Sequence, residues 1–292
     1  FIELDVLPRR VLIVGGGYIA AEYSHLAARA GAEVTILQRP ERLLPHFEPE
    51  PVDWLMPRFE ALGIAVRTGR AVTAVERAAG GLKVRARRKD GEELSLDADL
   101  VLHAAGRRPD LEALDLAAGD VVAEGGRLRL NDHLQSVSNP RVYAAGDAAG
   151  RGPPLTPVST HDAKVVAANL LEGPNRTPDY RAVPTVAFTI PPIAAVGLGE
   201  REAREQRLKF RVSSAATPDW FTARRLNERI YGHKVLVEEG TERILGAHLV
   251  GPGAEETINL FALAIRHGLT AEDLKSTMFA YPTAASDVGY MV

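Results

Sequence analysis

The fold is decided by one stretch in which a short apolar run meets three glycines, Val11-Leu12-Ile13-Val14-Gly15-Gly16-Gly17-Tyr18-Ile19-Ala20. The apolar run predicts a strand that is buried on both faces. Residues 18–30 predict a helix that ends at Gly31, and residues 34–37 predict a second strand. A strand, a helix and a parallel strand in this order form a right-handed crossover in nearly all folds. We therefore expect an α/β fold that begins with a Rossmann-like unit.

The spacing of Gly15, Gly17 and Ala20 matches the GxGxxA pattern of dinucleotide-binding turns. The first glycine permits a tight turn, the second lets backbone N–H groups approach a pyrophosphate, and Ala20 lets the helix pack closely on the strand. The start of the helix adds unpaired N–H donors and a partial positive charge. The alternative is a purely structural glycine turn, which the flanking strands and helix argue against. The residues expected to hold the dinucleotide are Gly15, Gly17, Tyr18, Ile19 and Ala20.

The residues after the second strand bear on which dinucleotide is bound. NAD sites usually place an Asp or Glu about 20 residues beyond the turn, where it holds the ribose 2′-hydroxyl. This chain has Gln38 there, followed by Arg39 and Arg42. A guanidinium attracts a 2′-phosphate, so we favour NADP(H) as the cofactor, with NAD(H) possible. The alternative is that both arginines are solvated surface charges and that selectivity is loose.

The rest of the chain divides into further segments. The first segment ends near Gly106, after predicted strands at 83–88, 94–96 and 100–104. A second segment, about 107–180, contains a predicted strand at 142–145 and a helix from Ser159 or Thr160, too little to bury a core without partners. A third segment begins near Pro184. Its predicted elements are strands at 185–189, 210–213, 234–238 and 244–250 and a helix at 254–267.

The composition argues against several classes of function. The chain of 292 residues carries a net charge of −3 and no cysteine. An acidic balance argues against nucleic acid or a membrane surface as partner, and no apolar stretch approaches the roughly 18 residues of a membrane span. The lack of cysteine excludes disulfides and thiol chemistry within this chain and fits a cytoplasmic location. The eight histidines lack the spacing of metal ligands, so we predict no metal site.

Four segments resemble one protein family. They are VLIVGGGYIAAEYS at 11–24, AAGRRPD at 104–110, NPRVYAAGD at 139–147 and LTPV at 155–158. Together with residues 184–292, they are similar in content and order to the flavoprotein disulfide reductases, the class I pyridine nucleotide-disulfide oxidoreductase family that includes glutathione reductase, lipoamide dehydrogenase and mercuric reductase. The resemblance implies an NAD(P)-binding domain at 1–106, the C-terminal part of an FAD-binding domain at 107–180 and an α+β dimerisation domain at 181–292, and hence a homodimer.

The same resemblance implies roles for individual residues. Asp147, preceded by Gly146, would bind the ribityl hydroxyls of FAD, and Gly106 lies in a second cofactor-binding glycine segment. Tyr18 would cover the flavin until nicotinamide displaces it, and Glu22 would lie near both rings. The alternatives are a turn residue for Asp147 and an exposed helix face for Glu22. The residues that would lie along the flavin are Leu155, Thr156, Pro157 and Val158.

Two features depart from the family pattern. The first half of the FAD-binding domain is not in this chain, which begins with Phe1, so we expect a piece of a longer polypeptide that does not hold FAD alone. The family's catalytic His-Pro-Thr segment is replaced by Tyr281-Pro282-Thr283. An unperturbed tyrosine titrates at about pH 10, so Tyr281 is a poor substitute for histidine in dithiol–disulfide exchange. Tyr281 is therefore either a catalytic residue of a different acceptor reaction or a packed interface aromatic.

Two functions follow from these expectations. In the first, the chain is the C-terminal two-thirds of a homodimeric FAD-dependent NAD(P)H oxidoreductase. Such an enzyme passes a hydride from nicotinamide to flavin and then electrons to a small-molecule acceptor, which the sequence leaves open among a disulfide, a quinone, a metal ion and oxygen. In the second, the chain by itself binds NAD(P) and dimerises without catalysis.

Overall fold

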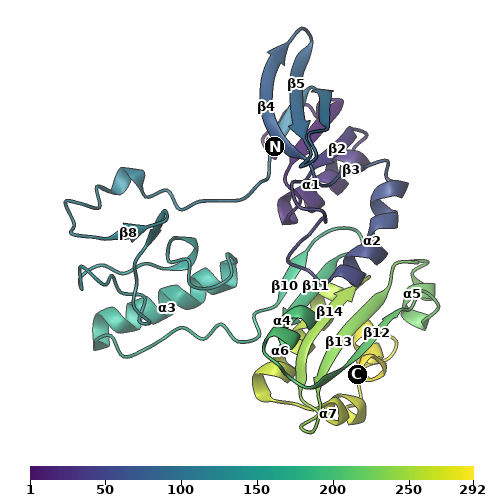
Figure 1. Ribbon diagram of the computed structural model, residues 1–292. Coiled ribbons are helices and arrows are strands. Elements are labelled where there is room, and N and C mark those ends of the chain that lie inside the picture. Colours follow the sequence, from purple (N-terminus) through teal and green to yellow (C-terminus); the bar gives the residue numbers. More distant parts are fainter. The chain divides into compact units, whose positions relative to one another are not determined.

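The computed structural model describes all residues 1–292 and divides the chain into two compact units. Unit 1 contains Phe1–Gly106 together with Pro184–Val292, and unit 2 is the intervening Arg107–Val183. Figure 1 shows both units and labels many of their helices and strands. Helices and strands alternate in the amino-terminal part, which confirms the α/β fold predicted from the sequence.

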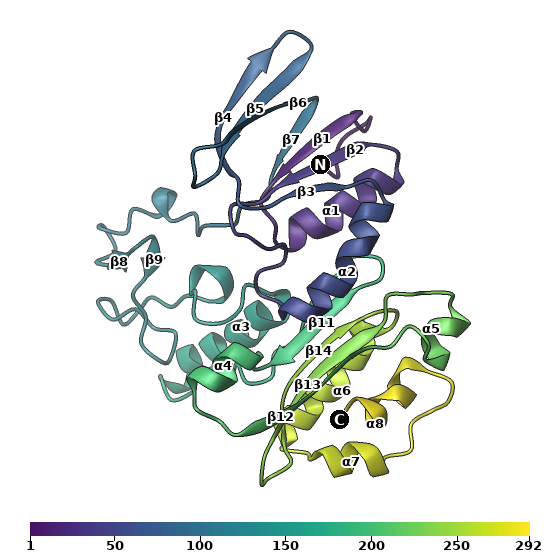
Figure 2. The same cartoon turned by 45° about the vertical axis from the view of Figure 1, so that its right-hand side comes forward.

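The amino-terminal part of unit 1 is built on a parallel sheet with strand order β3-β2-β1-β7. Its elements are β1 (Arg10–Val14), α1 (Tyr18–Arg29), β2 (Glu33–Leu37), α2 (Pro49–Ala61), β3 (Ala65–Arg67) and β7 (Leu100–His103). The helices α1 and α2 lie on one face of this sheet (Figure 2). Val11 and Ile13 are buried with these helices, whereas Leu12 is buried on the other face. Burial on both faces explains why β1 is a continuous apolar run.

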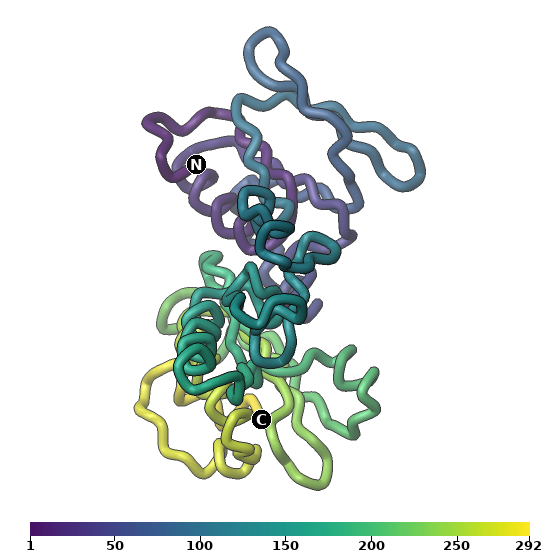
Figure 3. The backbone as a smooth tube through the Cα atoms, turned by 90° about the vertical axis from the view of Figure 1, so that its left-hand side faces the viewer, coloured from purple at the N-terminus to yellow at the C-terminus, as the bar shows by residue number.

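An antiparallel sheet covers the other face of the parallel sheet. Its strands are β4 (Ala71–Ala78), β5 (Gly81–Arg87) and β6 (Glu93–Ala98). Val84 and Ala86 of β5 pack with Leu12 and Leu37 of the parallel sheet. The turns of this small sheet form the blue loops that project from the parallel sheet in Figure 3. The small sheet therefore buries its inner face and leaves its turns in solvent.

The carboxyl-terminal part of unit 1 is built on an antiparallel sheet with strand order β10-β11-β14-β13-β12. The strands are β10 (Thr185–Ala187), β11 (Ile193–Gly197), β12 (Phe210–Ala216), β13 (Gly232–Glu238) and β14 (Ile244–Val250). The helical elements are α4 (Glu200–Glu205), α5 (Phe221–Arg225), α6 (Ala254–His267), α7 (Ala271–Ser276), η3 (Ala284–Asp287) and α8 (Val288–Met291). β13 and β14 pair as an antiparallel hairpin. No helix of the chain has the length and apolar character needed to cross a membrane.

One hydrophobic core joins the two parts of unit 1. Leu55 and Phe59 of α2 are fully buried. They belong to the same core cluster as Ile36 of the parallel sheet and Ile193 of the antiparallel sheet. Burying a leucine or phenylalanine side chain contributes about 1.5–3 kcal/mol. The two parts therefore pack as one unit, and the division into domains remains a prediction.

Unit 2 has little regular structure apart from the helix α3 (Thr156–Glu172). Its other elements are η1 (Glu112–Leu114), β8 (Ala123–Glu124), β9 (Arg127–Leu128) and η2 (Gly146–Ala148). The buried members of its hydrophobic cluster are Leu134, Ala144, Ala149 and Val165. Unit 2 thus has a much smaller core than unit 1.

Two predicted elements of unit 2 were wrong in detail. Residues 142–145 are not a strand, and this segment makes only an isolated bridge between Gln135 and Tyr143. A strand needs neighbouring strands for its N–H and C=O groups, and unit 2 offers no regular partner here. The helix begins at Thr156 rather than at Ser159 or Thr160. Pro157 fits the first turn, where its missing N–H costs no hydrogen bond.

The sequence patterns also miss nine elements of unit 1, namely α2, β3, β4, β11, α4, α5, α7, η3 and α8. The helix α2 contains Pro49, Pro51 and Pro57, residues that ordinarily argue against a helix. Two of them lie in the first turn, where proline is tolerated. Burial of Leu55 and Phe59 in the shared core stabilises the rest of the helix.

Candidate functional site

The turn between β1 and α1 uses its glycines for two different reasons. Gly15 has a φ of +118°, and a Cβ there would lie 2.2 Å from the carbonyl oxygen of Ala104. The fold itself therefore requires glycine at position 15. Gly17 has a φ of −88° and a ψ of −160°, and a Cβ there would meet nothing within 4 Å. Neither backbone conformation nor packing requires glycine at position 17, and the space beside the turn is open there.

The turn leads directly into α1, for which Gly17 is the N-cap residue. No side chain caps this end of the helix, and no acidic residue lies in its first turn. The first N–H groups and the positive end of the helix dipole are therefore left for an outside partner. Ile19 is partly exposed, while Ala20 is fully buried in the core. The small side chain of Ala20 lets α1 lie close to the sheet.

Gln38, at the end of β2, turns inward onto the glycine turn. The residue is 5% exposed, and its Nε2 donates to the carbonyl oxygen of Arg42 at 3.4 Å. A Cβ on Gly16 would lie 2.6 Å from the Cδ of Gln38. In addition, the N–H of Leu44 donates to the carbonyl oxygen of Gly16 at 2.7 Å. The segment after β2 therefore packs on the glycine turn.

The two arginines of this segment have different surroundings. Arg39 is exposed, and its guanidinium makes no hydrogen bond or ion pair within the chain. Arg42 donates from Nη1 to Oδ1 of Asp53 at 2.7 Å and to the carbonyl oxygen of Pro49 at 3.2 Å. Both of these partners belong to α2. Arg39 is thus available to an anionic ligand, whereas Arg42 already has partners.

Tyr18, the first residue of α1, connects the glycine turn to the antiparallel sheet of unit 1. Its hydroxyl oxygen lies 2.6 Å from Oγ1 of Thr185, the first residue of β10. Its ring packs edge-on against Phe47, with ring centroids 5.6 Å apart. The side chain is therefore held at both its ring and its hydroxyl.

Glu22 and His25 follow on the same face of α1, at helical spacings of four and three residues. Oε1 of Glu22 accepts a hydrogen bond from the N–H of Phe188 at 2.9 Å. Nδ1 of His25 accepts one from the N–H of Ile190 at 3.1 Å. Burial, helped by nearby arginine charges, lowers the pKa of His25 to about 4. With Tyr18, these side chains fasten one face of α1 to the β10 end of the antiparallel sheet.

Gly106 and the Gly146-Asp147 pair are the other predicted glycine segments. Gly106 ends the first part of unit 1 with a φ of +115°. In unit 2, Gly146 has a φ of +62°, and a Cβ there would lie 2.4 Å from Oγ of Ser159. Oδ2 of Asp147 lies 3.5 Å from Nε of Arg107, and the Asp147 side chain is 39% exposed. The carboxylate of Asp147 is therefore accessible to hydroxyl donors.

The predicted flavin-side residues 155–158 form the beginning of α3. Leu155 is the N-cap and makes no side-chain hydrogen bond to the helix. Val158 is buried, whereas the two residues between them, Thr156 and Pro157, are exposed. This end of α3 therefore presents backbone N–H groups without a side-chain cap.

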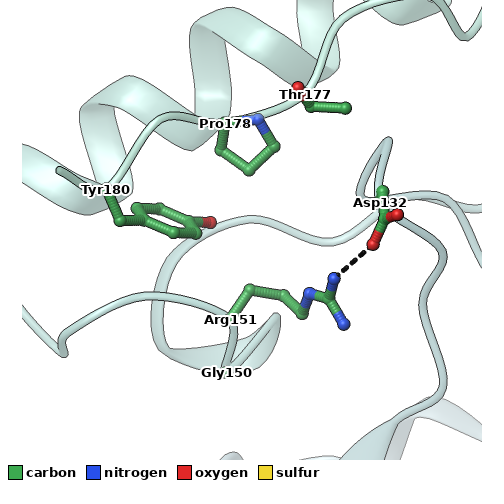
Figure 4. Close-up of a pocket in the computed structure, with 6 residues that line it drawn as sticks. All are labelled: Asp132, Gly150, Arg151, Thr177, Pro178 and Tyr180. Carbon is green, nitrogen blue, oxygen red and sulfur yellow. Dashed lines mark hydrogen bonds and ion pairs between the residues drawn. The ribbon is translucent and has the colours of Figure 1, made fainter. Parts of the chain in front are cut away.

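Unit 2 also contains a pocket of about 490 Å³, lined by Asp132, Gly150, Arg151, Thr177, Pro178 and Tyr180 (Figure 4). Arg151 and Asp132 form an ion pair at 2.6 Å beside it. The hydroxyl of Tyr180 donates to the buried Asp162 at 2.8 Å, and burial together with this hydrogen bond raises the pKa of Tyr180. None of the predicted FAD-binding residues lines this pocket.

Tyr281 lies on the surface of the carboxyl-terminal part of unit 1. It is 72% exposed and faces Phe221 of α5, with ring centroids 5.6 Å apart. Other exposed large apolar residues of this part are Phe188, Leu263, Met278 and Tyr290.

A buried ion cluster was not anticipated from the sequence. Lys234 of β13 is 2% exposed, and its Nζ lies 2.7 Å from the carboxylates of Glu48, Glu50 and Glu200. Burial lowers the pKa of Lys234, but these three hydrogen bonds outweigh it and raise the pKa overall. Glu48 and Glu50 flank the first residue of α2, so the cluster ties this helix to the antiparallel sheet. The one signal in the sequence is a lysine at the start of the predicted strand 234–238, just before the apolar run 235–237.

No group of three or more histidine, cysteine, aspartate or glutamate side chains is arranged to hold a metal ion. The predicted residues lie at three places. The turn residues, Glu22 on α1 and the segment after β2 lie in the amino-terminal part of unit 1, Tyr281 lies on the surface of its carboxyl-terminal part, and Asp147 and residues 155–158 lie in unit 2. Sequence spacing alone does not reveal the hydrogen bonds of Tyr18 with Thr185 and of Glu22 with Phe188, because they join positions far apart in the chain.

Comparison with known families matches most of the chain. Residues 1–163 match the pyridine nucleotide-disulphide oxidoreductase family, and residues 183–292 match the dimerisation domain of the same family. A Staphylococcus aureus protein described as an uncharacterized 19.7 kDa protein in the mercuric resistance operon is 46% identical over 180 residues, 61% of this chain and 100% of that protein.

Longer relatives extend beyond this chain. Mercuric reductase of Staphylococcus aureus is 36% identical over 287 residues, 97% of this chain and 52% of the reductase. The chain therefore spans about half the length of that reductase. Among solved structures, the Cu(II) complex of the HOCl-induced flavoprotein disulfide reductase RclA from Escherichia coli is similar, with a TM-score of 0.89 at 27% identity over 99% of this chain and 65% of that chain.

Proposed function

Because the chain belongs to the pyridine nucleotide-disulphide oxidoreductase family, we propose that it is the nucleotide-binding and dimerising part of an FAD-dependent NAD(P)H oxidoreductase. Bound FAD would supply the two-electron acceptor for the nicotinamide hydride. The residues of this chain bind the dinucleotide, orient its reduced ring and exclude water. The proposal includes the division into an NAD(P)-binding domain at 1–106, an FAD-domain segment at 107–180 and a dimerisation domain at 181–292.

The open space at Gly17 is the observation that carries this proposal. A glycine that is needed neither for its φ angle nor for packing is explained by a ligand whose backbone contacts require the missing side chain. The uncapped start of α1 lies next to this space and provides N–H donors for a pyrophosphate. Gly15 fixes the turn, and Ala20 fixes the distance between helix and sheet.

NADP(H) is the dinucleotide that the segment after β2 favours. The residue at the position that holds a ribose 2′-hydroxyl in NAD sites is Gln38, which has no carboxylate. Its amide group donates instead to the carbonyl oxygen of Arg42. The unpaired guanidinium of Arg39 supplies a charge for a 2′-phosphate. A tenfold or greater preference for NADH in titrations of the chain would reject this part of the proposal, since about 1.4 kcal/mol of discrimination would then favour the unphosphorylated ribose.

Glu22 and Tyr18 would act at the nicotinamide end of the dinucleotide. Both residues lie on α1 within five residues of the glycine turn, and both are held in place by the β10 end of the antiparallel sheet. Because the N–H of Phe188 occupies Oε1 of Glu22, Oε2 remains as an acceptor for a ligand amide. The proposed task of Glu22 is therefore to orient the ring.

The residues of unit 2 fit the ribityl and pyrimidine parts of FAD in chemical type. The exposed carboxylate of Asp147 would accept hydrogen bonds from hydroxyl groups. The uncapped start of α3, at residues 155–158, would donate N–H groups to carbonyl oxygens. The chain spans about half the length of the mercuric reductase of Staphylococcus aureus, which supports the view that other residues complete this site.

The proposal also covers the subunit contact and the electron acceptor. A homodimer through 181–292 is supported by the match to a dimerisation domain and by the exposed aromatic residues there. Tyr281 belongs to this surface and would face a small-molecule acceptor or the second subunit. Since one relative is a mercuric reductase, a mercuric ion is the acceptor to test first, although this chain has no cysteine to bind it.

The second candidate function is a binding and dimerisation module without catalysis. It is favoured by the small core of unit 2, in which the segment 142–145 has no partner strands. One measurement separates the two candidates: the purified 292-residue chain is inspected for the visible absorption of oxidised flavin and assayed for dye reduction with NADPH. A yellow chain that reduces the dye rejects the module, whereas a longer polypeptide containing this chain that is colourless and inactive rejects the enzyme.

A further inference from the structure

The side chain of Arg42 is held by residues of α2. Its guanidinium is engaged with the carboxylate of Asp53 at 2.7 Å and with the carbonyl oxygen of Pro49 at 3.2 Å. The Arg42 side chain is 39% exposed and that of Asp53 is 61% exposed, so this ion pair lies at the surface. It joins the segment after β2 to the first two turns of α2.

The segment that Arg42 holds is also in contact with the glycine turn. The carbonyl oxygen of Arg42 accepts a hydrogen bond from Gln38, whose side chain lies against Gly16. Two residues later, the N–H of Leu44 donates to the carbonyl oxygen of Gly16. Leu44 has a φ of +49°, a conformation that a leucine keeps only where its surroundings enforce it. Displacement of this segment would therefore displace the turn.

The first turn of α2, to which Arg42 binds, is itself held firmly in unit 1. Glu48 and Glu50, on either side of Pro49, both contact the buried Lys234 of the antiparallel sheet. Val52, next to Asp53, is buried in the core of unit 1. The start of α2 is thus fixed both by an ion cluster and by apolar packing.

We propose that Arg42 is a positioning residue which braces the segment 38–47 and the Gly16 carbonyl against α2, and that Arg39 alone reads the 2′-phosphate. This inference rests on the proposed function, because it assumes that the glycine turn binds the dinucleotide. The brace acts on the part of the site that contacts the pyrophosphate, which NADPH and NADH share. Its loss therefore weakens both dinucleotides by the same factor, whereas loss of Arg39 weakens NADPH alone.

The test is calorimetric titration of NADPH and NADH into the full chain and its variants. We expect R42Q and D53N each to weaken both dinucleotides equally, by about two- to fivefold, the size of effect of an exposed ion pair. The double variant should bind no more weakly than either single variant, because the two side chains form one contact. R42K, which keeps the charge, should recover part of the affinity. R39Q should weaken NADPH by about tenfold and leave NADH unchanged, as loss of a charge-assisted hydrogen bond to phosphate requires.

The matched control is R85Q, which breaks the exposed Arg85–Glu76 pair in the small sheet, 3.0 Å long, and should leave both affinities unchanged. Thermal unfolding of each variant checks that the fold is intact. The inference is overturned if R42Q weakens NADPH but not NADH, since Arg42 would then read the phosphate. It is equally overturned if R42Q and D53N have effects that multiply in the double variant. If the unmodified chain binds neither dinucleotide, the proposed function fails first and the inference fails with it.

Discussion

The glycine turn at 15–20 and the glycine–aspartate turn at 146–147 both stand before a helix, but they are supported in different ways. The first lies between a sheet strand and α1, and its neighbours β2, β7 and α2 belong to one large core. The second lies between an irregular segment and α3, in a unit whose core cluster has four buried members. The first glycine turn therefore rests on a large core and the second on a small one.

The difference shows which parts of a motif fold from local interactions. A helix forms its hydrogen bonds within itself, and α3 accordingly extends over 17 residues although unit 2 has little else to pack on it. A strand needs partners, and residues 142–145 make only one isolated bridge. The two units can be followed separately. Both tryptophans, Trp54 and Trp220, lie in unit 1, so tryptophan fluorescence reports on the unfolding of unit 1 alone.

The largest effect on unit 1 is expected from Lys234→Met. This change leaves the carboxylates around position 234 without their buried cation, so we expect the free energy of unfolding to fall by about 3–5 kcal/mol. Urea unfolding followed by tryptophan fluorescence measures it. Lys89→Met, at an exposed position, is the control and should change stability little. A loss no larger than that of the control would show that the cluster does not hold the two parts of unit 1 together.

Acid should also act on unit 1, through its buried histidines. Burial lowers the pKa of His25 and of His233 from 6.5 to about 4. Between these values the unfolded chain binds protons that the folded chain does not, so stability is full above pH 6.5 and falls as the pH drops toward 4. We expect a loss of about 2–3 kcal/mol for each histidine. His25→Asn keeps an acceptor for the N–H of Ile190 but cannot take up a proton. Urea unfolding of this variant between pH 7 and pH 4 should therefore show a smaller loss of stability than that of the unmodified chain. An unchanged pH dependence would contradict the assignment of this loss to His25.

A smaller and local effect is expected in unit 2 from Asp162→Asn. The fully buried carboxylate of Asp162 accepts from the N–H of Gly146 and from the hydroxyl of Tyr180. Replacing one acceptor oxygen with an amide donor should destabilise this region by about 1–3 kcal/mol. Hydrogen exchange should accelerate around Gly146 while tryptophan fluorescence of unit 1 stays unchanged. Asp110→Asn, an exposed position of the same unit, is the control, and equal exchange rates in the two variants would argue against the buried acceptor.

Much of this contrast was accessible from the sequence, for identifiable reasons. The elements of unit 1 around the turn are predicted correctly because the apolar run at 11–14 and the glycine spacing are local signals. The contacts of Tyr18 with Thr185 and of Lys234 with three glutamates were not, because they join residues more than 150 positions apart or depend on burial. The strand predicted at 142–145 was wrong because its apolar pattern says nothing about whether partner strands are present.

The most direct test of the account is titration of NADPH into the chain and its Gly17→Ala variant. Since a Cβ at position 17 meets nothing within 4 Å, this variant should unfold at nearly the same urea concentration as the unmodified chain. Its NADPH affinity should nevertheless fall by about tenfold or more, because the methyl group occupies the space of the pyrophosphate. Gly119→Ala, a position with ordinary packing outside the turn, should change neither quantity. Undiminished NADPH binding by Gly17→Ala would contradict the claim that this turn holds the dinucleotide.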